Sequence, residues 1–211
     1  GRPAQAFFVT GGNIDSMVAH YTVAKNRRNK DLYSPGGVTG KRPDRAVIAY
    51  CRKLKELYPD CPVIIGGLEA SLRRFAHYDY WDDAVRPSIL VDSRADLLVY
   101  GMGEAQTRQI VARLSSGESL RTMTDIKGTC CLVDAVDTPY RGTECPSYEN
   151  VLSSKSQYAV ACRIQQDEQD PIRGRTVKQR HGGKTLIQNE PMPPLDREEL
   201  DRVYALEYTR T

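Results

Sequence analysis

The stretch that decides the fold is Pro62-Val63-Ile64-Ile65-Gly66-Gly67. Its apolar residues leave no polar face, which is typical of a strand buried on both sides in a parallel sheet. Two other apolar runs, residues 6–9 and 96–100, also end close to paired glycines, at Gly11-Gly12 and at Gly101-Met102-Gly103. Strands of this kind that alternate with helical segments predict an α/β fold.

Segments with apolar residues at helical spacing lie between these strands. Residues 44–58 repeat apolar side chains at helical spacing and stop at Pro59, and a second helix follows Gly103 and ends at Gly117. Asp15 is placed to cap a shorter helix whose apolar face would extend to Ala24. We therefore expect a mostly parallel, doubly wound sheet that is Rossmann-like and similar to cobalamin-binding domains, with helices on both faces.

The pattern changes after residue 128. Residues 129–133 predict one more strand, residues 148–169 a helix, the segment around His181-Gly182-Gly183 a hairpin, and residues 196–205 a short acidic helix. We interpret residues 1–128 as the Rossmann-like domain. Residues 129–211 are interpreted as its last strand followed by a helix and hairpin arm that packs on something else.

The composition is that of an ordinary globular protein. The 211 residues include 40% hydrophobic and 27% charged residues and carry a formal net charge of +3. No window approaches the length of a membrane span, so no membrane partner is expected. The six cysteines contain no CxxC, which favours reduced, mostly buried thiols, a cytoplasmic location and no metal site. The chain begins at Gly1 rather than Met, which predicts a piece of a longer protein.

The glycine turns have two interpretations. At the carboxyl ends of parallel strands they would let backbone amides approach an anionic or polar ligand, as in nucleotide sites. They could equally serve only as tight turns between strand and helix. The third glycine of a dinucleotide fingerprint is missing after Gly101-Met102-Gly103, and GxxxxGK[ST], GxSxG and the cobalamin loop DxHxxG are absent.

The densest group of polar and aromatic residues spans residues 69–83 and includes the only tryptophan, Trp81. Arg73 and Arg74 could bind an anion while His77 and Asp79 supply acid-base or ligand groups. Alternatively, the same stretch could form a structural network in which arginines neutralise the acidic residues 82 and 83. Both interpretations stay open on the sequence.

Basic residues cluster between residues 25 and 45. No aromatic residues are interleaved with them in a way that suggests nucleic-acid binding, and the net charge is low. A solvated loop is therefore expected, and a nucleic-acid partner is considered unlikely.

Five stretches resemble the amino-terminal region of YgiQ-type radical SAM proteins, and the resemblance extends over essentially the whole chain. They are FVTGGNIDSMV (residues 8–18), KDLYSPGG (30–37), IGGLEASLRRFAHYDYWDD (65–83), DSRADLLVYGMGE (92–104) and DRVYAL (201–206). The last of these is similar to the segment that leads into the family's catalytic core.

The resemblance implies a bacterial protein whose core binds a 4Fe-4S iron-sulfur cluster through CxxxCxxC and cleaves S-adenosylmethionine. Successive cysteines here are separated by 10, 69, 1, 14 and 17 positions, so no triplet fits that motif. We therefore expect no catalytic residue, no metal ligand and no cofactor in this chain, with the cluster and S-adenosylmethionine bound beyond Thr211. Cobalamin is doubtful because DxHxxG is missing.

The function expected from the resemblance is an accessory domain that covers the downstream radical SAM barrel and lines a pocket for an unknown substrate or cofactor. The candidate ligand-binding residues are Asn13, Asp15, Gly66, Gly67, Glu69, Ser71, Arg73, Arg74, His77 and Glu104. Two alternatives stay open: a freestanding module that binds a cobalamin-like or nucleotide-like ligand, and a nucleic-acid-binding module.

Overall fold

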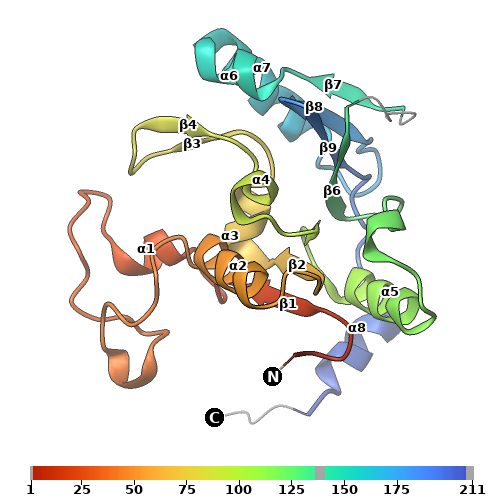
Figure 1. Ribbon diagram of the computed structural model, residues 1–211, viewed down its shortest axis with the longest axis horizontal. Coiled ribbons are helices and arrows are strands. Elements are labelled where there is room, and N and C mark those ends of the chain that lie inside the picture. Colours follow the sequence, from red (N-terminus) through yellow and green to blue (C-terminus); the bar gives the residue numbers. More distant parts are fainter. Residues whose placement is uncertain (1, 136–140, 208–211) are drawn as a thin grey trace.

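The computed structural model describes residues 2–135 and 141–207, which form an α/β fold around one mixed sheet (Figure 1). The seven-stranded sheet has the order β1-β2-β5-β6-β9-β8-β7. Its strands are β1 (Phe7–Thr10), β2 (Val63–Gly66), β5 (Leu97–Val99), β6 (Thr129–Asp134), β7 (Thr143–Cys145), β8 (Val177–His181) and β9 (Lys184–Gln188). A separate hairpin consists of β3 (His77–Asp79) and β4 (Ala84–Arg86).

The helices connect and cover these strands. They are α1 (Ser16–His20), α2 (Ala46–Leu57), α3 (Gly67–Leu72), α4 (Ile89–Ser93), α5 (Glu104–Ser115), α6 (Tyr148–Ser153), α7 (Lys155–Asp167) and α8 (Arg197–Tyr204). Two short 3-10 turns, η1 (Pro35–Gly37) and η2 (Leu120–Thr122), lie in the connecting segments. The predicted helices before Pro59 and before Gly117 are confirmed.

The parallel part of the sheet is β1-β2-β5. Thr10 lies opposite Gly66, and Ile65 lies opposite Leu98, so the carboxyl ends of the three strands meet at one edge. β6 then pairs antiparallel with β5 and with β9, and the predicted β8–β9 hairpin adds to the same sheet. The change in strand direction begins at Thr129, close to the division that the sequence suggested at residue 128, although the sheet continues across it.

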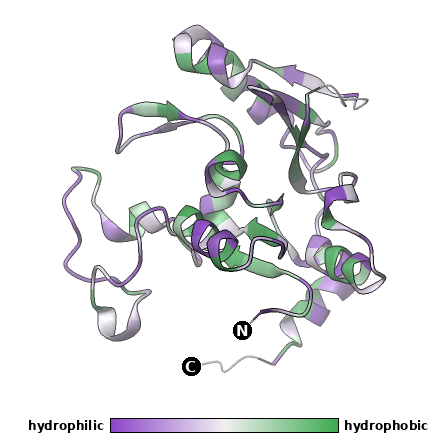
Figure 2. Ribbon diagram, viewed as in Figure 1, coloured by the Kyte–Doolittle hydropathy of each residue, from purple (hydrophilic) through white to green (hydrophobic). Residues whose placement is uncertain are grey.

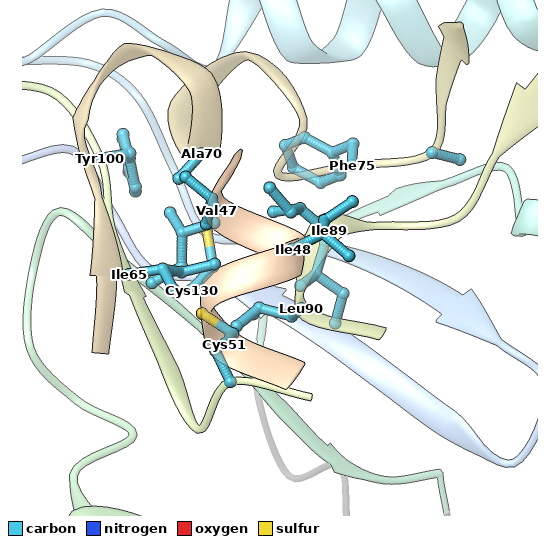
Figure 3. Close-up of a cluster of buried hydrophobic side chains, with 14 of the residues drawn as sticks. Val47, Ile48, Cys51, Ile65, Ala70, Phe75, Ile89, Leu90, Tyr100 and Cys130 are labelled. Carbon is cyan, nitrogen blue, oxygen red and sulfur yellow. The ribbon is translucent and has the colours of Figure 1, made fainter. Parts of the chain in front are cut away.

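Side chains alternate between two cores, one on each face of the sheet. Val63 and Ile65 pack with helices α2, α3 and α4, whereas Ile64 packs with Ile110 of α5 on the opposite face. Figure 3 shows the first core, where Val47 of α2 lies close to Ile65. In Figure 2, the strands β1, β2 and β6 are largely hydrophobic, whereas the helices carry both hydrophobic and hydrophilic residues. Helices on both faces confirm the doubly wound arrangement.

Two predicted helices differ from the structure. The helix capped by Asp15 ends at His20 rather than reaching Ala24, because the chain turns back and Tyr21 forms an isolated bridge with Arg27. The predicted helix over residues 148–169 is divided into α6 and α7 at Ser154, whose side chain caps α7. Lys155, which would fall on the apolar face of a single helix over residues 148–169, is instead the first residue of α7.

Candidate functional site

A small hollow lies at the carboxyl edge of the parallel strands. It has a volume of about 330 Å³ and is lined at this edge by Thr10, Gly66, Gly67, Gly101 and Gly103. Gly67 has a φ of +81°, and a Cβ there would lie 2.4 Å from Thr10 Oγ1. The glycine therefore permits both the left-handed backbone and the close approach of the first turn of α3 to β1. Two of the three glycine turns that the sequence singled out, Gly66-Gly67 and Gly101-Met102-Gly103, thus meet at one rim, whereas Gly11 and Gly12 do not line it.

A second hollow adjoins the first through Gly103 and Thr107, which line both. It has a volume of about 600 Å³ and lies between α5 and α8, with Leu195, Val203 and Leu206 on its apolar side. Glu104 lines it at the start of α5, and its Oε2 is buried without a hydrogen-bond partner among the described residues.

A third and more polar pocket of about 510 Å³ lies between α1 and the β3–β4 hairpin. We call it the aromatic pocket, because the rings of Tyr21, Tyr78, Tyr80, Trp81 and Tyr158 line it. The sequence candidates Asp15, Arg73 and His77 also lie in its wall. Burial lowers the pKa of His77, whose Nδ1 contacts the carbonyl of Phe75.

Two of the candidate carboxylates are used by the fold. Glu69 is 1% exposed and accepts hydrogen bonds from the backbone amides of Ser16 and Val47, so one side chain holds the starts of both α1 and α2. Asp15 caps α1 through Met17 N and forms an ion pair with Arg73. Neither carboxylate is free to approach a ligand without giving up these bonds.

Arg74 is also committed to internal contacts. Its Nε donates to Gln188 Oε1 at 2.6 Å, its Nη1 donates to the carbonyl of Ser71, and its guanidinium lies over the Tyr100 ring at 5.1 Å. Ser71 itself is half-buried on α3. Asn13 is exposed in the turn between β1 and α1. The ten candidates are therefore divided among three hollows, internal contacts and one exposed turn, and ligand binding by them stays a prediction.

The structural network predicted for residues 69–83 exists, but arginines outside that stretch form it. Arg45 and Arg86 both pair with Asp79 and Asp82. Burial raises the pKa of Asp79, but the hydrogen bond from Arg45 holds that pKa below its usual value. Asp83 is instead bonded by the Tyr78 hydroxyl.

Two buried glutamines were missed by the sequence analysis. Gln179 and Gln188 are 0% exposed and belong to β8 and β9. Gln179 Oε1 accepts from the amide of Ala76, and Gln188 bonds Arg74. The stretch with the candidate residues is thereby attached to the antiparallel half of the sheet. The only available signal was a glutamine at an inward position of each predicted hairpin strand.

The cysteines do not fit an iron-sulfur cluster. Five of the six are buried, and all six are free. Burial raises the pKa of Cys51, Cys131 and Cys145 to about 12, which opposes the thiolate form that a metal requires. Within residues 2–135 and 141–207, no group of three or more His, Cys, Asp or Glu residues is arranged to hold a metal ion.

Comparison with known proteins identifies the family. The family described as radical SAM N-terminal matches residues 1–211, so the chain belongs to it. A UPF0313 protein of Clostridium perfringens (strain SM101) is 56% identical over 212 residues, covering 100% of this chain and 32% of that protein. A UPF0313 protein of Clostridium botulinum (strain ATCC 19397) is 53% identical over 211 residues, covering 100% of this chain and 33% of that protein.

The chain thus spans about a third of the length of the curated relatives it matches. No solved structure matches it. Among the described residues, no helix has both the length and the apolar character needed to cross a membrane.

Proposed function

We propose that this chain is the accessory domain of a radical SAM protein and packs against the catalytic domain of the same polypeptide. It contributes one wall of the pocket in which the substrate is held. The iron-sulfur cluster and S-adenosylmethionine are bound by the catalytic domain, which performs the radical chemistry. Free cysteines throughout this chain fit the reducing cytoplasm as the site of action.

The observation that carries this proposal is the adjacency of the two hollows at the carboxyl edge of the sheet. Open α/β sheets bind ligands at this edge. Glycines line one hollow there, and the neighbouring hollow presents apolar side chains on and next to the last described helix. Leu200, Tyr204 and Leu206 of this region are 41%, 69% and 58% exposed, an apolar surface suited to a covering domain.

Hydrogen exchange tests the packing without knowledge of the substrate. We compare this chain alone with the longer polypeptide that carries it and measure amide protection by mass spectrometry. Amides of residues 100–107 and 195–206 should exchange at least about tenfold more slowly in the longer polypeptide, because packing removes them from water.

The outward face of α7 provides the internal control. Val160 is 46% exposed there, and peptides of this helix should exchange equally in both proteins. We call residues 100–107 and 195–206 the packing edge. Equal exchange of these residues in both proteins, or added protection confined to α7, would contradict the proposal that this edge contacts the catalytic domain.

A further inference from the structure

The basic loop after α1 and the aromatic residues of the β3–β4 hairpin are separate in sequence but adjacent in the structure. The Tyr80 hydroxyl donates to the carbonyl of Val23 at 2.8 Å, and Lys25 Nζ donates to the carbonyl of Trp81 at 3.2 Å. Figure 2 shows that the long loop between α1 and α2 is mainly hydrophilic. The interleaving of basic and aromatic residues that the sequence lacked is thus created by folding.

The rings form an open aromatic wall. The Tyr21 and Trp81 ring centroids are 4.5 Å apart, and those of Tyr80 and Trp81 are 5.8 Å apart. Tyr78 and Tyr80 are 47% and 48% exposed, so part of each ring is open to solvent at the pocket. The pocket volume of about 510 Å³ is within the range of small-ligand sites.

Three cations of the loop after α1 lie beside this wall, of which Arg28 lines the pocket. Lys25 Nζ lies 4.7 Å from the Tyr80 ring centroid, and Arg27 lies 5.9 Å from that of Tyr21. Arg28 lines the pocket, and its Nε donates only to the carbonyls of Val18 and Tyr21. Among the described residues, none of these three cations lies within ion-pair distance of a carboxylate.

The carboxylates near the pocket already have partners. Asp15 is paired with Arg73, Asp79 is paired with Arg45, and Asp44 accepts from the Tyr21 hydroxyl and contacts His20. Asp44 and Asp83 are held by tyrosine hydroxyls, whereas Lys25, Arg27 and Arg28 are cations on the loop side of the pocket that have no ion-pair partner among the described residues. Flat rings next to unpaired cations are the features that bind a stacked base and its phosphate.

We propose that the aromatic pocket binds a nucleobase and its phosphate, with the base stacked on the Tyr80–Trp81 wall and the phosphate bound by Arg27 and Arg28. The same chemistry occurs in a free nucleotide and in a single-stranded nucleic acid. The inference goes beyond the proposed function, because the aromatic pocket shares no described lining residue with the two hollows that carry that function.

Fluorescence provides a direct probe, because Trp81 is the only tryptophan of the chain. We titrate the chain with adenosine monophosphate, with a 12-nucleotide single-stranded RNA and with the same RNA as a duplex. Stacking should quench Trp81 saturably with a Kd of about 1–100 µM, and affinity for the RNA should fall as salt is added. Quenching by the monophosphate at equal strength identifies a free nucleotide, whereas quenching by the single strand alone identifies nucleic acid.

Variants are measured by anisotropy of a labelled ligand, both in this chain and in the longer polypeptide that carries it. Tyr80→Ala should weaken binding about 5- to 150-fold, the range for loss of one stacked base. Arg27→Gln with Arg28→Gln should reduce the salt slope by about 1.4, or 0.7 for each lost phosphate contact. Both arginines are exposed, so these variants should remain folded.

Matched controls are Tyr50→Ala on α2 and Arg121→Gln on η2, both at exposed positions away from the pocket. They should bind as the unaltered protein does. Absence of binding in both proteins, equal binding of duplex and single strand, or equal losses in control and pocket variants would overturn the proposal. Because the readout is binding, such a failure would leave the packing edge tested by hydrogen exchange unaffected.

Discussion

Glu69 illustrates how a single residue can look like a ligand group in the sequence and serve the fold. It follows a glycine pair at the end of a buried strand, as a ligand-binding carboxylate often does. In the structure its two oxygens accept from Ser16 N at 2.9 Å and Val47 N at 3.0 Å. A Cβ at Gly11 would lie 2.6 Å from Glu69 Oε2, so the glycine leaves room for this carboxylate.

Replacement of Glu69 by glutamine tests this role. The amide group of Glu69→Gln offers only one acceptor oxygen, so one of the two buried backbone amides loses its partner. We expect the free energy of unfolding to fall by about 1.5–3 kcal/mol, the range for a hydrogen bond to a charged group. Urea unfolding followed by circular dichroism measures the change.

The control is Glu56→Gln, which alters an exposed carboxylate paired with Lys53. Exposed pairs contribute little, so we expect a change below about 0.5 kcal/mol. Similar losses in both variants would show that Glu69 does not hold the two helices.

At the scale of elements, the β8–β9 hairpin joins α6 through a buried histidine. His181 ends β8, and its ring stacks on Tyr148 with centroids 5.7 Å apart. Burial lowers the pKa of His181 to about 4, with Glu149 raising it and His77 lowering it. The hairpin is therefore packed around a neutral imidazole.

This buried imidazole predicts that acid weakens the fold. The unfolded chain gains a proton on His181 near pH 6.5, whereas the folded protein gains it only near pH 4. Above pH 6.5 the imidazole is neutral in both states, and the full free energy of unfolding is present. As the pH falls from about 6.5 to about 4, protonation of the unfolded chain lowers the free energy of unfolding by about 2–3 kcal/mol. The half-buried His77, whose pKa is also lowered, adds in the same direction.

Urea unfolding at pH 7, 6, 5 and 4 measures this dependence, with His181→Gln as the comparison. The variant should be less stable at pH 7 and should show a flatter pH profile over this range. Parallel profiles for the two proteins would contradict the assignment to His181.

At the scale of the whole molecule, the two halves of the sheet share both cores. Cys130 of β6 and Leu186 of β9 belong to the core beneath α2, and Cys131 and Ile187 belong to the core beneath α5. The antiparallel half therefore supplies buried surface that the parallel half needs, while α8 contributes no buried residue.

Truncation separates these contributions. A chain of residues 1–128 should show no cooperative thermal transition, because β5 becomes an exposed edge and both cores lose one side. A chain of residues 1–195, which lacks α8 and the residues that follow it, should melt within about 5 °C of the complete chain. Cooperative melting of residues 1–128 would instead support the predicted division into a domain and an arm.

The sequence predicted the elements better than their contacts. The buried strand at residues 62–65, the helix before Pro59 and the hairpin at Gly182-Gly183 all depend on local patterns of apolar residues and turn-forming residues. The same patterns placed Gly66, Gly67 and Gly101 at one edge, because parallel strands end together. They could not show that Gln179 and Gln188 reach the stretch after α3, since more than 100 positions separate Arg74 from Gln188.

The α/β class, the glycine-rimmed edge and the family resemblance were thus determined by the sequence itself, because each depends on neighbouring residues. Only the tertiary structure decided which polar residues are committed to the fold and which face a pocket. Asp15 and Glu69 have the same carboxylate and similar positions after a strand, yet their partners come from distant segments. Which partner a polar group meets depends on how the chain packs, and that packing also brought a basic loop to an aromatic hairpin.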